Sequence, residues 1–188
     1  MPNSSFLNDE RHSTTSASKW DARQVAICAL FSAAAIATSY ISIPIFPAAP
    51  FLKYDPSGII CLLAVLLYGT KTGAVVVTLP WVIRAFTNPA GALMSFVIGL
   101  GGILVAGIIL DKISGMKGVV IALVTSAVVS VILAIIMNLI VTPVFSGVPV
   151  ESVLGMIVPI LLPFNIMKFA LNSVVAGIAY MPLKKLLK

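Results

Sequence analysis

Four long apolar runs constrain this chain more than any other feature of its sequence. Three lie at residues 24–43, 90–110 and 118–142, and a fourth, at about 158–183, is broken only by a few polar side chains. A helix needs about 20 residues to cross the ~30 Å hydrocarbon core of a bilayer, so each run is long enough to span a membrane. Hydrophobic residues make up 60% of the chain and charged residues only 10%. The sequence therefore predicts an all-α integral membrane protein.

A fifth apolar region at residues 57–86 is divided into two short pieces by "YGTKTG" at 68–73. It fits either two short or tilted helices or one long span. Two helices would give six spans and would place nine basic residues on one side, with Lys53 on the other. The nine are Arg11, Lys19, Arg23, Lys71, Lys112, Lys117, Lys184, Lys185 and Lys188. Because Lys and Arg collect on the cytoplasmic side, we expect six transmembrane helices with both termini cytoplasmic.

The first 20 residues are polar and rich in Ser and Thr, so we expect a disordered cytoplasmic tail at 1–20 and a six-helix membrane domain at 21–188. The net charge of +6 is explained by cytoplasmic loops that face anionic lipid headgroups, without a nucleic-acid partner. Cys28 and Cys61 fall in separate spans and in no CxxC or Cys/His pattern. We expect both to be packing residues, with no disulfide, metal site or resident cofactor.

The common enzyme signatures are missing from the sequence. "YGTKTG" lacks the glycines of a phosphate-binding loop, and no HExxH helix, GxSxG turn or paired intramembrane carboxylate occurs. The acidic residues fall in the tail or at helix ends, whereas an ion-coupled carrier would be expected to hold a buried acid. They are Asp9, Glu10, Asp21, Asp55, Asp111 and Glu151. The chain is therefore not expected to be an enzyme, and uphill transport through it would need partner subunits.

Lys168 lies inside the last apolar run, between Asn165 and Asn172. The three residues are spaced i, i+3 and i+7, so they share one helical face that must point away from lipid. A charged group in the hydrocarbon core is costly and tends to mark a ligand pathway. The alternative is a structural lysine bonded to backbone carbonyls. We take the three as candidate ligand-binding residues.

Trp81 and Arg84 are three residues apart on one helical face, close to Asn88 in the following loop. An aromatic surface with amide and cationic donors suits a planar heteroaromatic ligand that bears carbonyl groups and a polyol. An interfacial tryptophan and a snorkelling arginine would give the same pattern. The sequence leaves both interpretations open.

A proline-rich loop follows the first span, from Pro44 to Pro56, and carries Phe46, Phe51 and Tyr54. These aromatic residues indicate either an interfacial connector with membrane anchors or a lid over a binding pocket.

Ala29, Ala33 and Ala37 recur every four residues in the first span. Small residues at this spacing let another helix backbone approach closely. The pattern indicates either ordinary packing within the chain or a docking face for a partner membrane subunit.

Several segments together resemble a known family. They are "FLKYDPSGI" after the proline-rich loop, the alanine-patterned first span after a basic tail, "MNLIVTPVF" and "PFNIMKFALNSVV". From about residue 20 to its end the chain resembles the substrate-binding S components of energy-coupling factor (ECF) vitamin transporters, in particular the riboflavin-specific type. Gly58 stands where that type is expected to carry an acidic residue after "DPS".

The resemblance implies a multi-pass protein of the bacterial plasma membrane that binds riboflavin or a related flavin from outside. It implies a membrane coupling subunit and two cytoplasmic ATPases as partners, and a ligand pocket at Asn138, Asn165 and Lys168. It also implies that the protein topples in the membrane to carry its ligand inward. The sequence leaves two alternatives: an S component for another vitamin, or a small membrane protein with an assembly or pore role.

Overall fold

The computed structural model describes residues 21–45 and 52–186. The expected tail at 1–20 therefore lies outside the described residues. The elements in chain order are α1 (Ala22–Ser39), β1 (Ile43–Pro44), β2 (Lys53–Tyr54), α2 (Ser57–Tyr68), α3 (Thr70–Arg84), α4 (Pro89–Lys112), α5 (Gly115–Ser146), α6 (Val150–Met156), the π-helical turn η1 (Ile157–Leu161) and α7 (Leu162–Leu186).

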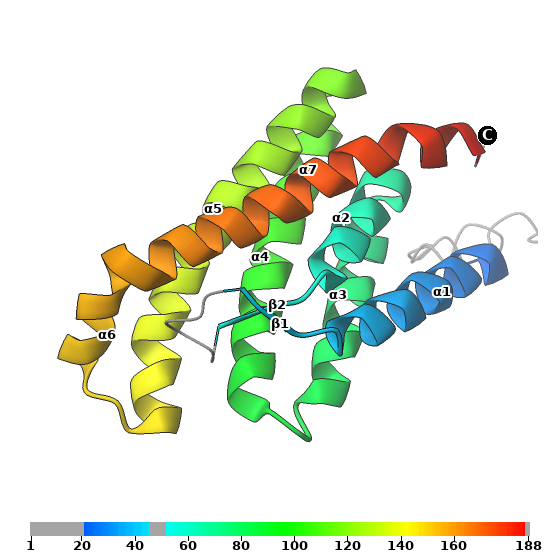
Figure 1. Ribbon diagram of the computed structural model, residues 1–188. Coiled ribbons are helices and arrows are strands. Elements are labelled where there is room, and N and C mark those ends of the chain that lie inside the picture. The colour runs from blue at the N-terminus through cyan, green and yellow to red at the C-terminus, as the bar shows by residue number, and fades with distance from the viewer. Residues whose placement is uncertain (1–20, 46–51, 187–188) are drawn as a thin grey trace, which may run out of the picture.

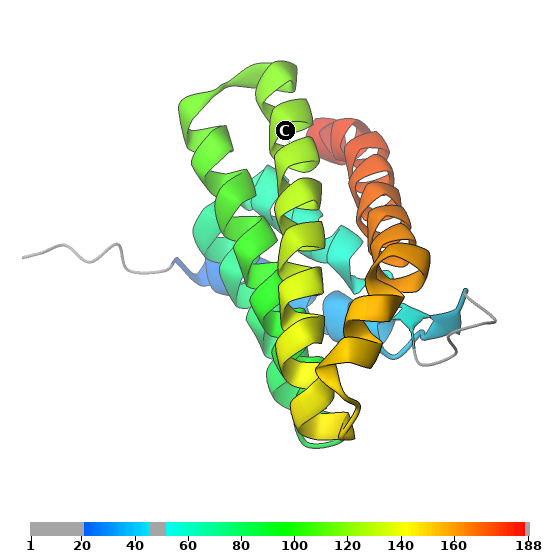
Figure 2. The same ribbon diagram turned by 90° about the vertical axis from the view of Figure 1, so that its left-hand side faces the viewer.

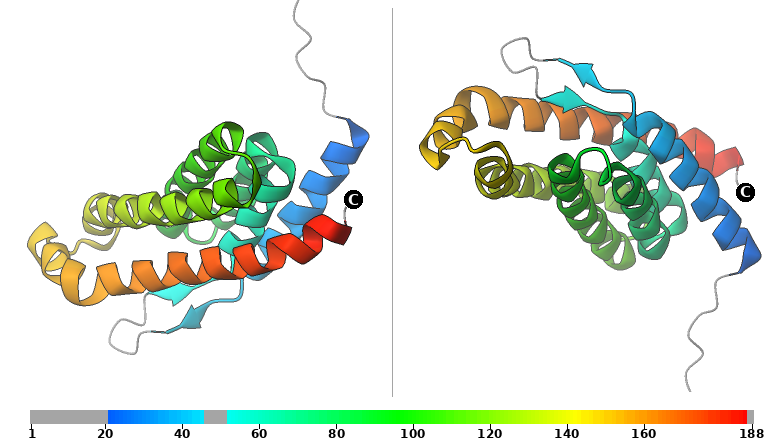
Figure 3. Two further views of the ribbon diagram at one scale, coloured as in Figure 1. Left: turned by 90° about the horizontal axis from the view of Figure 1, so that it is seen from above. Right: turned by 90° about the horizontal axis from the view of Figure 1, so that it is seen from below.

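The helices form one bundle in which α4 and α5 run side by side in opposite directions (Figures 1 and 2). α3 and α2 pack beside α4, and α1 lies against α2 and α3 at the edge of the bundle. α7 crosses obliquely over α5 and α2, and the short antiparallel β1–β2 pair lies along it (Figure 3). This arrangement brings the end of the loop before α2 next to the middle of α7.

Four helical segments are long and apolar enough to cross a membrane: α1, α4, α5 and the continuous helix Val150–Leu186. They correspond to the four apolar runs, so the expected membrane-protein architecture is supported. α2 has 12 residues and α3 has 15. At 1.5 Å per residue they reach only ~18 and ~22 Å, less than the ~30 Å core. The six-span count and the orientation of the termini therefore stay predictions.

The outer face of α5 shows why the bundle needs lipid around it. Exposed β-branched residues recur there every fourth position. They are Val120, Val124, Val128, Ile132, Ile136, Ile140 and Val144. A continuous apolar stripe of this length would promote aggregation in water, whereas it is the expected surface of a helix in lipid.

The predicted division of residues 57–86 into two helices is confirmed, but the joint is shorter than expected. Gly69 is the one residue between α2 and α3, and its φ of 86° is a conformation that favours glycine. The helices then pack closely, because a Cβ placed on Gly73 would come within 2.8 Å of the Val65 Cβ. Pro80 has no backbone N–H, so it cannot donate the usual helical hydrogen bond to the Val76 carbonyl within α3. The buried Cys61 thiol donates to that carbonyl instead, with its Sγ 4.0 Å from the oxygen.

Two helix boundaries expected from the sequence are wrong. α5 continues past residue 142 to Ser146, with Pro143 inside it, and the last helix begins at Val150 rather than near 158. Proline is tolerated in membrane helices because local adjustments satisfy the freed backbone groups. Here the π-helical turn η1 surrounds Pro159 and widens the helix where the proline ring would otherwise clash.

Candidate functional site

Two adjoining cavities lie between the β2–α2 segment, α3, α4, α5 and α7. The larger cavity has a volume of about 480 Å³ and the smaller one about 100 Å³. Cavities that hold small organic ligands measure about 300–1,000 Å³, so the larger cavity has room for one. The two share a wall made of Asp55, Trp81, Ser95, Ile98, Asn165 and Lys168.

The structure brings the predicted ligand-binding residues together around these cavities. Asn172 lines the smaller cavity. The other six line the larger cavity, and they come from three different helices and a loop. They are Trp81, Arg84, Asn88, Asn138, Asn165 and Lys168. The shared helical face expected for Asn165, Lys168 and Asn172 therefore points into the protein.

Among the described residues, Lys168 is held by a carboxylate and not by backbone carbonyls. Its Nζ donates to Asp55 Oδ2 at 2.9 Å, and the two side chains are 17% and 10% exposed. The Ser57 hydroxyl donates to the other oxygen of the same carboxylate, Asp55 Oδ1. Asp55 does lie just before a helix, as the sequence indicated, but the expectation that no acid is buried is wrong, because Asp55 is buried against α7. Asp55 and Ser57 are the site residues that the sequence analysis missed.

The charge of Asp55 is stabilised by its partners. Burial alone would favour the neutral carboxyl, but the Lys168 ammonium and the Ser57 hydroxyl outweigh burial and hold the pKa of Asp55 below its ordinary value of 3.8. Asp55 therefore remains ionised at neutral pH.

Tyr54, for which the sequence left an interfacial anchor or a lid residue open, is buried beside this ion pair and is therefore not an exposed interfacial anchor. Its hydroxyl donates to Asn172 Oδ1 at 3.0 Å. Burial and the adjacent Asp55 charge raise the pKa of Tyr54, so the phenol stays protonated and remains a donor. Phe46 and Phe51, the other two aromatic residues of the expected lid, lie outside the described residues.

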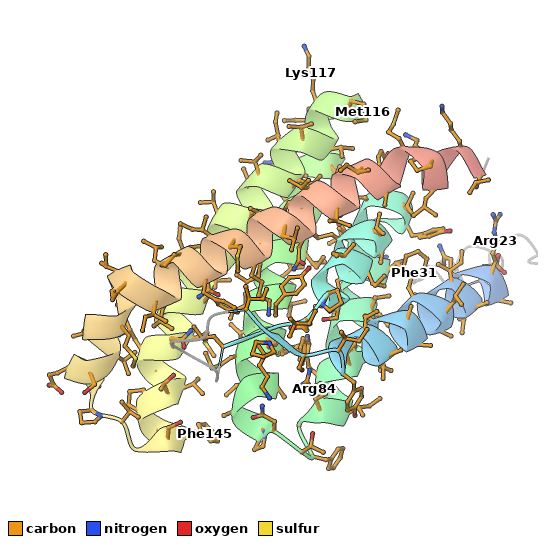
Figure 4. All side chains as sticks on the ribbon, viewed as in Figure 1. Arg23, Phe31, Arg84, Met116, Lys117 and Phe145 are labelled. Atoms are coloured by element: carbon orange, nitrogen blue, oxygen red, sulfur yellow. The ribbon has the colours of Figure 1, made fainter. Side chains whose placement is uncertain are left out.

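Trp81 is buried in the cavity wall, which favours the ligand-site interpretation over an interfacial tryptophan. Arg84 packs beside it, with the guanidinium carbon 5.5 Å from the Trp81 ring centre and 5.7 Å from that of Tyr40. The same guanidinium donates to the Ser39 carbonyl at the end of α1. Figure 4 places Arg84 towards the same end of the bundle as Phe145 and away from Lys117.

The amides of Asn138 and Asn165 each have a partner in their own helix. Asn138 donates to the Ala134 carbonyl and Asn165 to the Leu161 carbonyl, each at 2.7 Å. A carboxamide carries two N–H donors, so one on each of these residues is left for a ligand. Asn88 caps α4, because its Oδ1 accepts from the Gly91 N–H at 3.0 Å.

The predicted docking residues form a separate surface. Ala29, Ala33 and Ala37 are all exposed, whereas Cys28 and Ala35 on the other side of α1 are buried. Packing within the described part of the chain therefore does not use the alanine stripe. Both cysteines are free and buried, as expected of packing residues.

Comparisons with known proteins agree with this architecture. Residues 23–180 match the family model of the ECF transporter, substrate-specific component. A solved structure described as the S component of a bacterial ECF transporter is similar to the chain, with a TM-score of 0.77 and 27% sequence identity, over 88% of this chain and 98% of that one. No curated protein matches the chain. The chain therefore belongs to the family of ECF transporter substrate-specific components, which are membrane-embedded substrate-binding subunits and not enzymes, and which work with ECF coupling and ATPase subunits.

Proposed function

We propose that this S component captures riboflavin from outside the cell and delivers it inward across the bacterial plasma membrane, together with a membrane coupling subunit and two cytoplasmic ATPases. The observation that carries the proposal is the convergence of Trp81, Asn138, Asn165 and Lys168 on one cavity of about 480 Å³.

The chemistry of the cavity suits a flavin. Riboflavin combines a planar aromatic ring system with an edge of carbonyl oxygens, ring nitrogens and an N–H group, and it carries no net charge. Trp81 offers an aromatic surface, Lys168 offers N–H donors, and the amides of Asn138 and Asn165 can both donate and accept. A ligand with donors and acceptors on one edge can be recognised by this set.

The proposed partners follow from what the chain lacks and what it exposes. Its sequence has no phosphate-binding loop, so the energy for uphill transport has to come from ATPase subunits. The exposed stripe of Ala29, Ala33 and Ala37 on α1 supports close packing against a helix of the coupling subunit.

The direct test is to purify the protein in mild detergent, identify any bound molecule by mass spectrometry, and titrate the ligand-free protein with riboflavin. Binding quenches flavin fluorescence, so the affinity is read directly. We expect a yellow preparation or saturable quenching at one riboflavin per chain. Absence of both in folded protein would refute riboflavin as the substrate.

A second candidate, an S component for another vitamin, is favoured by one observation. Gly58 lines the smaller cavity, where the riboflavin type is expected to carry an acidic side chain, and a Cβ there would come within 2.5 Å of Asn172 Nδ2. The cavity wall therefore differs at this position. Competition of thiamine, biotin and folate against riboflavin in the same titration separates the two candidates.

A further inference from the structure

We propose that Asp55 is a positioning residue of the ligand site: it fixes the Lys168 ammonium in the wall between the two cavities, and it affects ligand affinity through Lys168. This inference rests on the proposed function and adds to it a residue outside the predicted ligand-binding set.

The hydrogen bonds of Asp55 show that it acts through its partners. One carboxylate oxygen accepts from Lys168 Nζ at 2.9 Å and the other accepts from the Ser57 hydroxyl. The side chain is only 10% exposed. Both oxygens are therefore engaged within the protein, and the group with donors to spare is the ammonium.

Lys168 has three N–H donors, and Asp55 takes one of them. A lysine side chain is long and flexible, and a ligand that has to immobilise it loses affinity in doing so. Because the ion pair already holds the ammonium in the wall of both cavities, its two remaining donors are presented to a ligand without that cost.

The position of Asp55 in the chain makes it a rigid support. It lies between Tyr54 and the first turn of α2, and the Tyr54 hydroxyl bonds Asn172 one turn beyond Lys168 on α7. Two neighbouring residues of one segment thus bind successive turns of the same helix. The ion pair is fixed from both sides before any ligand arrives.

The pair also sets the charge that a ligand meets. Together Asp55 and Lys168 are neutral, so they present N–H donors without net positive charge, which suits an uncharged carbonyl edge better than an anion. The other charged residues in the larger cavity are Lys53 from β2 and Arg84 from α3, while α4 and α5 contribute only uncharged residues to the described lining.

A double-mutant cycle tests the proposal with riboflavin as the probe. Affinities are measured by flavin-fluorescence quenching for the unmodified chain, Asp55→Asn, Lys168→Met and the double variant. Because hydrogen bonds to a charged group are strong, Lys168→Met should weaken riboflavin affinity by about 10- to 100-fold. We expect Asp55→Asn to weaken it by about tenfold. In the Lys168→Met background, Asp55→Asn is expected to change affinity by less than about twofold, because the group that it positions is gone. Asp55→Glu, which keeps the carboxylate, is expected to recover part of the loss.

Two further variants keep the test decisive. Asp111→Asn removes a carboxylate that lines a separate cavity of about 310 Å³, and it is expected to leave affinity unchanged. If Asp55→Asn does not fold, Ser57→Ala removes only the hydroxyl that steadies the carboxylate and is expected to weaken binding about two- to threefold, again only when Lys168 is present.

The outcomes separate this inference from the proposed function. An equal loss from Asp55→Asn in both backgrounds, no loss at all, or the same loss from Asp111→Asn would overturn the positioning role while riboflavin remains the substrate. Failure of the unmodified, folded chain to bind riboflavin would overturn the proposed substrate itself, and this inference with it.

Discussion

Two alanines on opposite sides of α1 give a sharp test of the docking surface. Ala33 is exposed, whereas Ala35, two residues later, has no exposed surface. Replacing Ala33 with leucine adds three carbons where the coupling subunit is expected to pack, at the 8–10 Å or so that separates closely packed helices. As an exposed substitution, Ala33→Leu should change the stability of the isolated chain by no more than about 0.5 kcal/mol. Ala35→Leu overpacks the interior and should cost about 1–3 kcal/mol.

The assay compares three properties of these variants: thermal stability in detergent, riboflavin affinity of the isolated chain, and recovery of the coupling subunit when the complete transporter is expressed and purified. Ala33→Leu is expected to keep its thermal stability and its riboflavin affinity. It is expected to recover at least about tenfold less of the coupling subunit, with a parallel loss of riboflavin uptake. Ala35→Leu is expected to lose stability first. The docking hypothesis would be refuted if Ala33→Leu retained the coupling subunit, or if it lost stability and riboflavin binding as Ala35→Leu does.

Three further predictions concern the site, the topology and the ion pair. Asn165→Leu, like Lys168→Met, should weaken riboflavin binding by about 10-fold or more in folded protein, measured by fluorescence quenching alongside melting temperature; unchanged affinity in both would exclude the proposed site. An impermeant thiol reagent applied to intact cells should label Lys53→Cys but not Lys117→Cys, and labelling of the latter would contradict the six-span topology. The pKa of Asp55 is lowered in the folded protein, so its contribution to stability should be complete above the ordinary pKa of 3.8 and should be lost as the pH falls below that value. Melting temperatures measured from pH 8 to pH 3 should show this loss of stability in acid, and the Asp55→Asn variant should not show it.

Those parts of the fold that depend on local sequence were predictable. The four long apolar runs became the four long helices, because length and hydropathy alone decide whether a helix can cross lipid. The division of residues 57–86 was also predictable, since two glycines and the charged Lys71 interrupt an apolar run there. The helix ends at Ser146 and Val150 were not, because a proline near the end of a membrane helix stops it in one context and is accommodated in another.

The partner of Lys168 could not be read from spacing. Asp55 and Lys168 are 113 residues apart, and no periodic pattern links a loop residue to a distant helix. The available signal was energetic: an ammonium inside a span requires a counter-charge, and Asp55 is one of the few acidic residues that lie close to an apolar run. Treating the lysine as a ligand donor explained its presence without asking what neutralises it when no ligand is bound.

The buried Asp55 also bears on the source of energy for transport. An ion-coupled carrier was not expected because no acid was expected to be buried, and that expectation is wrong, because Asp55 is buried. A carboxylate that carries protons must gain and lose them near neutral pH. Asp55 has both oxygens engaged, by Lys168 and Ser57, and its pKa is held below the ordinary value, so it stays ionised across that range. The buried acid is thus part of a fixed neutral pair and is not suited to carry protons, and the need for ATPase subunits rests on the family and on the missing phosphate-binding loop.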